Sequence, residues 1–239
     1  HTRLQGDWSS DVCSSDLAFM ATRAPEVNDA YRALRPGAFK ADLFRLCILE
    51  ERGGVYVDCH AGPMVPLDDM MPHVRGKAEY FVSVKDTPLS SAGIHNGFIA
   101  ASAHHPFLQA AIRHIVANVS RRAYDIHMLA VTGPLALRNA MNEYAGRRRG
   151  QDFPLGHSVV AGHDLYLFEF IPGSNQYIYD KGEVLLYKKY SAPVFLATIL
   201  RGTRYEEMWR QRNIYVQPSP PASRKQQPWR HHIRYAQSS

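Results

Sequence analysis

Apolar residues cover most of the circumference of a helix predicted at residues 38–52. A helix that is apolar on nearly all sides is expected to be buried. Gly53 and Gly54 follow, and glycine tolerates the left-handed backbone angles that end many helices. The next residues, 55–57, form a short apolar run without alternation, which predicts a strand buried on both faces. The apolar residues of the helix are Phe39, Leu43, Phe44, Leu46, Cys47, Ile48 and Leu49.

The remainder of the chain alternates between helix and strand patterns. Residues 25–35 and 106–119 begin with proline and have apolar residues at three- and four-residue spacing, which is typical of amphipathic helices. Thr132 supplies a capping hydroxyl before a further predicted helix at 135–144. This alternation predicts an α/β domain. The other predicted elements are strands at 80–84, 97–101, 164–171 and 184–187, and a short helix at 205–212.

The two ends of the chain differ in composition from the part between them. Residues 1–17 show neither an apolar period nor a signal-peptide pattern, and we interpret them as a non-native leader. Residues 217–239 are rich in Pro, Ser, Gln and Arg, which predicts a flexible basic tail. One domain at 18–216 is therefore expected, consistent with 239 residues of which 45% are hydrophobic. Because nucleotide-binding α/β domains usually open with a strand, we expect this domain to lack its N-terminal strand.

The chain is basic, with a formal net charge of +6 and a pI near 9.3. This balance suits a phosphate-bearing partner, which can be a nucleic acid, an anionic membrane surface or a nucleotide-linked substrate. Three cysteines without a CxxC pair indicate a reducing compartment or a fold that does not depend on disulfides. No apolar run approaches the roughly 20 residues that a membrane helix needs, which predicts a soluble domain.

Asp42 and Arg45 lie three residues apart on the apolar helix and therefore share one face. One interpretation is an ion pair within the helix. A buried ion pair usually costs about as much free energy as it gains, so a role in ligand binding is the second interpretation. A carboxylate can accept hydrogen bonds from sugar hydroxyls while a guanidinium holds a phosphate.

Asp58 and His60 follow the predicted strand at its carboxyl end, where open α/β sheets bind ligands. Alternate residues of an extended segment point the same way, so the two side chains can converge on one ion. The other interpretation is a turn followed by a solvent-exposed histidine. Asp with neutral His suits a divalent ion such as manganese. Cys59 points the opposite way and is interpreted as a buried structural thiol.

Two further polar clusters have simpler interpretations. His104 and His105 directly precede a predicted helix and are expected to lie in an exposed turn. Arg147, Arg148 and Arg149 form a basic loop, which is either solvated or in contact with an anionic lipid or polysaccharide.

The motifs KADLFR and GGVYVDCH, followed by NGFIAA and TGP, resemble the sugar transferases of glycosyltransferase family 32, which carry an Asp-x-Asp motif. This family includes mannosyltransferases and enzymes of capsular polysaccharide synthesis. The resemblance runs from about Pro36 to Tyr144. It implies a GT-A type, Rossmann-like fold with a mostly parallel sheet flanked by helices. It also implies a nucleotide-sugar donor, Mn²⁺ or Mg²⁺ against the diphosphate, and retention of the sugar's configuration.

The same resemblance implies a catalytic set of Asp42, Arg45 and Asp58. Asp42 would bind hydroxyls of the donor sugar, Arg45 the sugar or its phosphate, and Asp58 would be the first carboxylate of the metal-binding motif. His60 stands where the family commonly has the second carboxylate, and as a metal ligand it should weaken magnesium more than manganese. The implied substrate-binding residues are Tyr56, Gly53, Gly54, Asn96, Gly97, Thr132, Gly133 and Pro134.

These expectations describe an enzyme that moves a hexose from a UDP- or GDP-linked donor to a hydroxyl of a glycan, lipid or protein. We expect little activity from a truncated chain. The alternative is a catalytically inactive domain that binds a sugar nucleotide or a glycan, which His60 motivates. Nucleic acid is not an expected partner, because the basic tail comes without an aromatic-lined groove. We expect a cytoplasmic location, with peripheral membrane contact or the Golgi lumen as alternatives.

Overall fold

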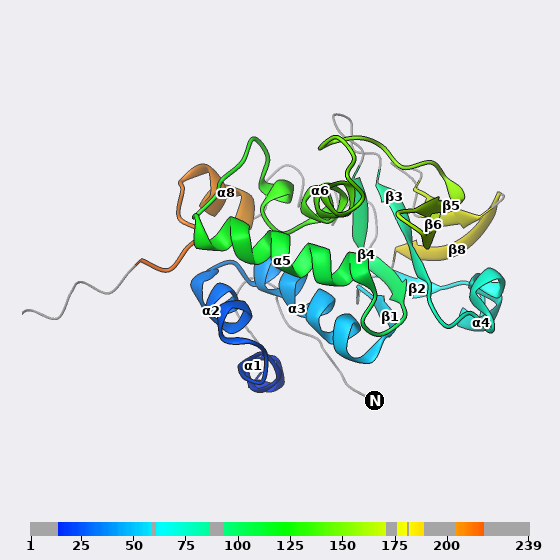
Figure 1. Cartoon of the computed structure of the whole chain (residues 1–239), viewed down its shortest axis with the longest axis horizontal. Helices are drawn as coiled ribbons and strands as arrows, with labels where there is room; N and C mark the ends of the chain where they lie inside the picture. Colours follow the sequence, from blue (N-terminus) through cyan, green and yellow to red (C-terminus); the bar gives the residue numbers. More distant parts are fainter. Residues whose placement is uncertain are drawn as a thin grey trace, which may run out of the picture.

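The structure is a computed structural model that describes residues 14–58, 61–86, 93–170, 176–180, 182–188 and 204–217. Most of the helices gather on one side of the molecule and the strands on the other (Figure 1). Helix α5 packs against α2, α3 and α6, while α3 and α6 also contact the sheet at β4. The expectation of an α/β fold is therefore confirmed.

The strands form one eight-stranded sheet with the order β1-β4-β3-β6-β7-β8-β2, in which β5 pairs with β6. Only β3 and β6 run parallel among the strand pairs of the described residues, so the expected mostly parallel sheet is wrong. Two-residue connections join β5 to β6 and β7 to β8, and such short connections force an antiparallel pair. The strands are β1 (Gly54–Val57), β2 (Ala61–Pro63), β3 (Phe81–Asp86), β4 (Gly93–Ala101), β5 (Gly156–Val160), β6 (His163–Glu169), β7 (Gln176–Asp180) and β8 (Glu183–Lys188).

The predicted helices are confirmed, with ends that differ by a few residues. Helix α1 was not predicted, and it extends across the boundary expected at residue 17. Among the residues placed in the structure, no helix is long and apolar enough to cross a bilayer. The expected tail, residues 217–239, lies outside the described residues except for residue 217. The helices are α1 (Ser14–Ala21), α2 (Pro25–Ala33), α3 (Gly37–Arg52), α4 (Leu67–Met70), α5 (Pro106–Ser120), α6 (Pro134–Tyr144) and α8 (Arg204–Arg210), with 3-10 turns at Pro72–Val74 and Met128–Ala130.

Strand β1 lies at one end of the sheet and is more exposed than its sequence predicts. Its described partner is β4, and Val55 on this strand is 36% exposed. The expectation of a strand buried on both faces is therefore wrong, because the apolar run lies at the end of the strand order. Gly53, at the C-cap of α3, has a φ of 64°. A Cβ at Gly53 would come within 2.6 Å of the Ala103 backbone nitrogen, so this turn requires glycine.

His105 is buried at the start of α5 and is 1% exposed. Its Nδ1 accepts a hydrogen bond of 3.2 Å from the backbone nitrogen of Phe107, which caps the helix. The expectation that both histidines lie in an exposed turn is wrong for His105, although the side chain of His104 is 70% exposed. Burial lowers the pKa of His105 to about 4, with Glu79 opposing the shift and His163 adding to it.

We expect His105→Asn to remove part of the acid sensitivity of the fold. Between pH 4 and about 6.5 the unfolded histidine binds a proton and the folded one does not, so stability falls with decreasing pH. Over this pH range the free energy of unfolding falls by up to about 3 kcal/mol because of this histidine. Asparagine can cap the helix but does not titrate. Urea unfolding across this range should show a flatter pH dependence in the variant. His104→Asn is the control, and an unchanged slope in His105→Asn would contradict the assignment.

Candidate active site

The side chain of Arg45 links α3, the end of β1 and strand β4. This residue is 6% exposed. Its guanidinium lies 3.4 Å from an oxygen of Asp42 and 3.4 Å from an oxygen of Asp58. It also donates hydrogen bonds to the carbonyl oxygens of Asn96 at 2.7 Å and Ala41 at 3.1 Å. The buried guanidinium of Arg45 therefore contacts two carboxylates, that of Asp42 on α3 and that of Asp58 directly after β1.

Both carboxylate oxygens of Asp42 accept hydrogen bonds from other elements. Asn96 Nδ2 donates to Oδ1 at 2.8 Å, and Thr132 Oγ1 donates to Oδ2 at 2.8 Å. Burial raises the pKa of Asp42 above its ordinary value, while Arg45, Thr132 and Asn96 favour the charged form. The three partners fix the carboxylate in one orientation, and its remaining lone pairs can accept from a ligand.

Thr132 does not cap α6, contrary to the expectation from its sequence position. Gly133 is the N-cap of this helix, and no side chain caps it. The hydroxyl of Thr132 donates to the carboxylate of Asp42 instead, because a charged acceptor forms the stronger hydrogen bond. Pro134 begins the helix against Gly93, where a Cβ would lie 2.9 Å from the Pro134 Cβ. Glycine at position 93 therefore lets the start of α6 approach β4.

Asp58 is the more open of the two carboxylates, with a side chain that is 20% exposed against 14% for Asp42. Tyr56 donates its hydroxyl proton to Asp58 Oδ1 at 2.9 Å, and Arg45 lies 4.6 Å from the centre of the Tyr56 ring. Burial raises the pKa of Tyr56, so this residue stays a phenol that donates to the carboxylate.

Because Gly97 has no side chain, the carboxylate of Asp58 can lie directly against its backbone. A Cβ at this position would lie 2.5 Å from Asp58 Oδ2 and 2.5 Å from His95 Cε1. The backbone oxygen of Gly97 also accepts from the Asp58 nitrogen at 2.8 Å. His95 lies next to the site, and sequence reasoning missed it. Its position two residues before Gly97 on one strand was the available signal.

The structure thus brings together most of the residues that the sequence singled out. Gly53 and Gly133 lie at the ends of α3 and α6, and Gly54 begins β1; the substrate-binding roles of all these residues stay predictions. His60 and Cys59 lie outside the described residues. The residues that meet are Asp42, Arg45, Tyr56, Asp58, Asn96, Gly97 and Thr132.

The described part of the site offers one carboxylate that fits a divalent ion. Oxygen donors suit Mg²⁺ and Mn²⁺, and Asp58 is partly exposed. Within the described ranges, no group of three or more His, Cys, Asp or Glu side chains is placed to hold a metal ion. Asp58 can therefore supply a ligand, while the remaining ligands would have to come from the donor diphosphate or from His60.

Residues 5–77 match the family model of the glycosyltransferase sugar-binding region containing a DXD motif. This stretch holds Asp42, Arg45, Tyr56 and Asp58, which meet in the site. This stretch is therefore similar to a glycosyltransferase sugar-binding region. The family resemblance inferred from the sequence motifs is confirmed by this match.

The chain is also similar to inositol phosphoceramide mannosyltransferase 3 of Schizosaccharomyces pombe, with 29% identity over 178 residues. The alignment covers 70% of this chain and 46% of the mannosyltransferase, so the chain spans less than half the length of that relative. Among solved structures, the PaToxG glycosyltransferase has 20% sequence identity and a TM-score of 0.35. That match covers 46% of this chain and 36% of the other, and the score is too low to establish a common fold. The family match and the mannosyltransferase relative both agree with the expected resemblance to glycosyltransferases.

Proposed function

We propose that this chain belongs to an enzyme that transfers a hexose from a nucleotide-diphospho-sugar to a hydroxyl acceptor. The observation that carries the proposal is Arg45, held between Asp42 and Asp58 inside the matched sugar-binding region. Such a site holds two acceptor groups in fixed positions, which is what recognition of several sugar hydroxyls requires. A GT-A fold is part of the proposal.

Asp42 and Asp58 have different roles in this proposal. Asp42 is fixed by hydrogen bonds to both of its oxygens and accepts from hydroxyls of the donor sugar. Asp58 is more exposed and would hold a divalent ion, preferably manganese, together with His60. Such an ion would neutralise the charge that develops on the departing diphosphate.

Arg45 acts as a positioning residue rather than a direct phosphate ligand. Its guanidinium is engaged with the carboxylates and with the Asn96 carbonyl, and the residue is nearly buried. It therefore fixes the two carboxylates next to each other, and its charge favours the ionised form of Asp42 against the effect of burial.

The proposed reaction exchanges one bond at the anomeric carbon for another. The bond from this carbon to the diphosphate oxygen breaks, and the acceptor oxygen bonds to the same carbon on the same face. The acceptor proton passes to the departing diphosphate, so the reaction needs no protein base. The fixed charges of the site contribute by stabilising the transition state, in which each 1.36 kcal/mol corresponds to about a tenfold change in rate.

Release of free sugar from GDP-mannose and UDP-glucose tests this proposal. The relative from Schizosaccharomyces pombe is named a mannosyltransferase, so a mannosyl donor is the first choice. Incubation with Mn²⁺ should release sugar, detected by chromatography, and Asp42→Asn should suppress the release because it removes the charged acceptor. Equal rates in the protein and in Asp42→Asn would contradict the proposal. Donor binding in calorimetry without release would favour the alternative, an inactive sugar-nucleotide-binding domain.

A further inference from the structure

A groove of about 710 Å³ lies between α5 and α6, two helices that are in contact and are neighbours in Figure 1. None of the residues of the candidate active site lines this groove. The lining is rich in arginine, and the polar residues that matter here are Arg113, His114, Arg121, Glu143, Arg147 and Arg149.

Three of the four arginines have protein contacts that orient them along the groove. Arg121 donates to the side chain of Asn118, Arg147 to the carbonyl of Asp152, and Arg149 pairs with Asp125. Arg121 directly follows the end of α5, where a cation offsets the helix dipole.

Arg113 lies in the middle of α5, so the helix dipole does not explain its presence. Its side chain forms no ion pair with the other described residues. Glu143 is the carboxylate that lines the groove, and Asp125 pairs with Arg149, so the four lining arginines outnumber these two carboxylates.

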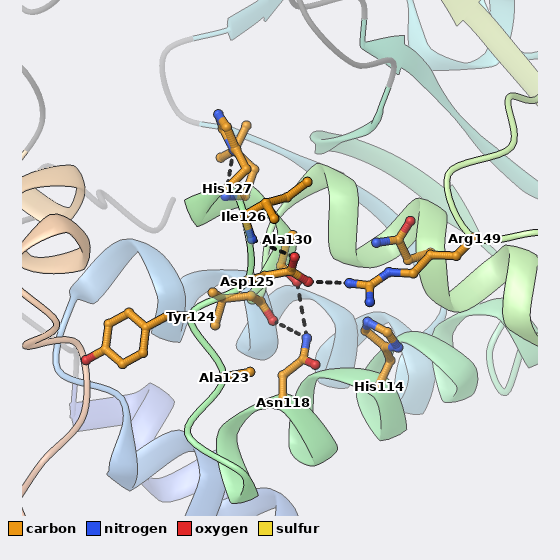
Figure 2. Close-up of polar contacts among 12 residues, drawn as sticks. His114, Asn118, Ala123, Tyr124, Asp125, Ile126, His127, Ala130 and Arg149 are labelled. Carbon is orange, nitrogen blue, oxygen red and sulfur yellow. Dashed lines mark hydrogen bonds and ion pairs between the residues drawn. The ribbon is translucent and has the colours of Figure 1, made fainter.

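His114 adds a buried polar group to the same groove. Its side chain is 10% exposed, and Nδ1 lies 3.1 Å from a carboxylate oxygen of Glu143. Its Nε2 is buried and has no hydrogen-bond partner among the residues placed in the structure. In Figure 2 the ring reaches from α5 toward the guanidinium of Arg149. An unpartnered buried nitrogen is costly, and an anion held by the arginines would satisfy it when both ring nitrogens carry a proton.

Residues 125–131, in the connection from α5 to α6 beside the groove, are held in place by hydrogen bonds and an ion pair within the protein. Asn118 is 1% exposed and donates from its amide to the carbonyl oxygens of Ala130 at 3.2 Å and Val131 at 2.9 Å. The pair of Asp125 with Arg149 ties the same segment to the chain after α6, as Figure 2 shows. These contacts join protein groups only, so the protein itself arranges the side of the groove that an anion would meet.

We infer that this groove binds a phosphate group carried as a monoester or diester. Guanidinium groups match the oxygens of a phosphate in geometry and charge. Ile126, next to Asp125, is 94% exposed, so an apolar side chain stands near the groove. A phospholipid headgroup and a soluble phosphate ester are therefore the two sources of this chemistry. The site does not depend on the proposed transfer reaction, since binding is measured without turnover.

Binding of phosphate probes to the full chain tests this inference. Calorimetry with inorganic phosphate and glycerol 3-phosphate examines the soluble source, and pelleting with phosphatidylcholine vesicles, with and without phosphatidic acid, examines the lipid source. Saturable binding of a soluble probe assigns the groove to soluble esters. Binding only to vesicles that contain phosphatidic acid assigns it to a lipid headgroup. In either case, Arg113→Gln with Arg149→Gln should weaken binding about tenfold or more, because two charged hydrogen-bond donors are lost.

The matched control removes the same charge outside the groove. Arg52→Gln with Arg75→Gln replaces arginines whose side chains are 67% and 62% exposed. If the double variant does not fold because the ion pair between Arg149 and Asp125 is lost, Arg113→Gln alone provides the test. This single variant should still weaken binding severalfold. Absence of binding to every probe, or an equal loss in the groove variant and the control, would overturn the inference.

Discussion

Asp58→Asn is expected to lower sugar transfer about a hundredfold or more. Asparagine has nearly the same shape and keeps an oxygen that can accept from Tyr56, as Asp58 does at 2.9 Å. The change removes the negative charge and therefore any strong interaction with a divalent ion. The measurement is kcat/KM for sugar release with GDP-mannose or UDP-glucose at saturating Mn²⁺.

The control for Asp58→Asn is Asp69→Asn. The side chain of Asp69 is 64% exposed on α4, where it pairs with Arg75, and its loss should leave the rate unchanged. Thermal unfolding of both variants shows whether the fold is intact. A rate in Asp58→Asn close to that of the unmodified protein would be evidence that this carboxylate has no role in the reaction.

Arg45→Met is expected to destabilise the fold by about 3–5 kcal/mol, the range for breaking a buried ion pair from one side. The guanidinium is the cation between Asp42 and Asp58 and also satisfies the Asn96 carbonyl. Methionine fills a similar volume but leaves two carboxylates without a neighbouring cation. Urea unfolding at neutral pH measures the change in the free energy of unfolding.

The pH dependence of Arg45→Met distinguishes lost charge from lost packing. Burial already raises the pKa of Asp42, and removing Arg45 should raise it further. A carboxyl whose folded pKa is raised favours the folded state at low pH and loses that contribution as the pH rises through the folded pKa. The deficit of the variant against the unmodified protein should therefore shrink as the pH falls toward about 4. A deficit independent of pH would instead point to packing.

Arg45→Lys is the matched comparison, because lysine keeps the charge without the planar fork that contacts both carboxylates. Its loss of stability should lie between that of the unmodified protein and that of Arg45→Met. Adding Asp42→Asn to Arg45→Met should recover part of the lost stability, since one of the two uncompensated charges is removed.

Local patterns predicted the elements that carry the site. The apolar run of α3 and the glycines after it predicted a helix, a turn and a strand, and all three are present. The spacing of Asp42 and Arg45 placed them on one helix face, where their side chains meet. These features depend on residues within a few positions of one another, so a sequence pattern is enough to find them.

Other predictions were wrong, because the features that they concern depend on contacts between residues far apart in the sequence. The expected parallel sheet followed from a family resemblance, whereas short connections between later strands make most of the pairs antiparallel. The apolar run of β1 predicted burial, but its place at the end of the strand order leaves Val55 exposed. The pattern around His105 indicated a turn and did not show that aromatic residues cover it.

The sequence alone determined the charged groups of the site and the family to which residues 5–77 are similar. It did so because Asp42, Arg45, Tyr56 and Asp58 lie close together in the chain, on a helix and the strand that follows it. The tertiary structure decided which residues from distant parts of the chain form hydrogen bonds with these groups. Asn96 and Thr132 reach Asp42 from 54 and 90 residues away, because α3 and α6 both pack against β4. Contacts across such separations depend on how the elements pack, and no local pattern specifies that packing.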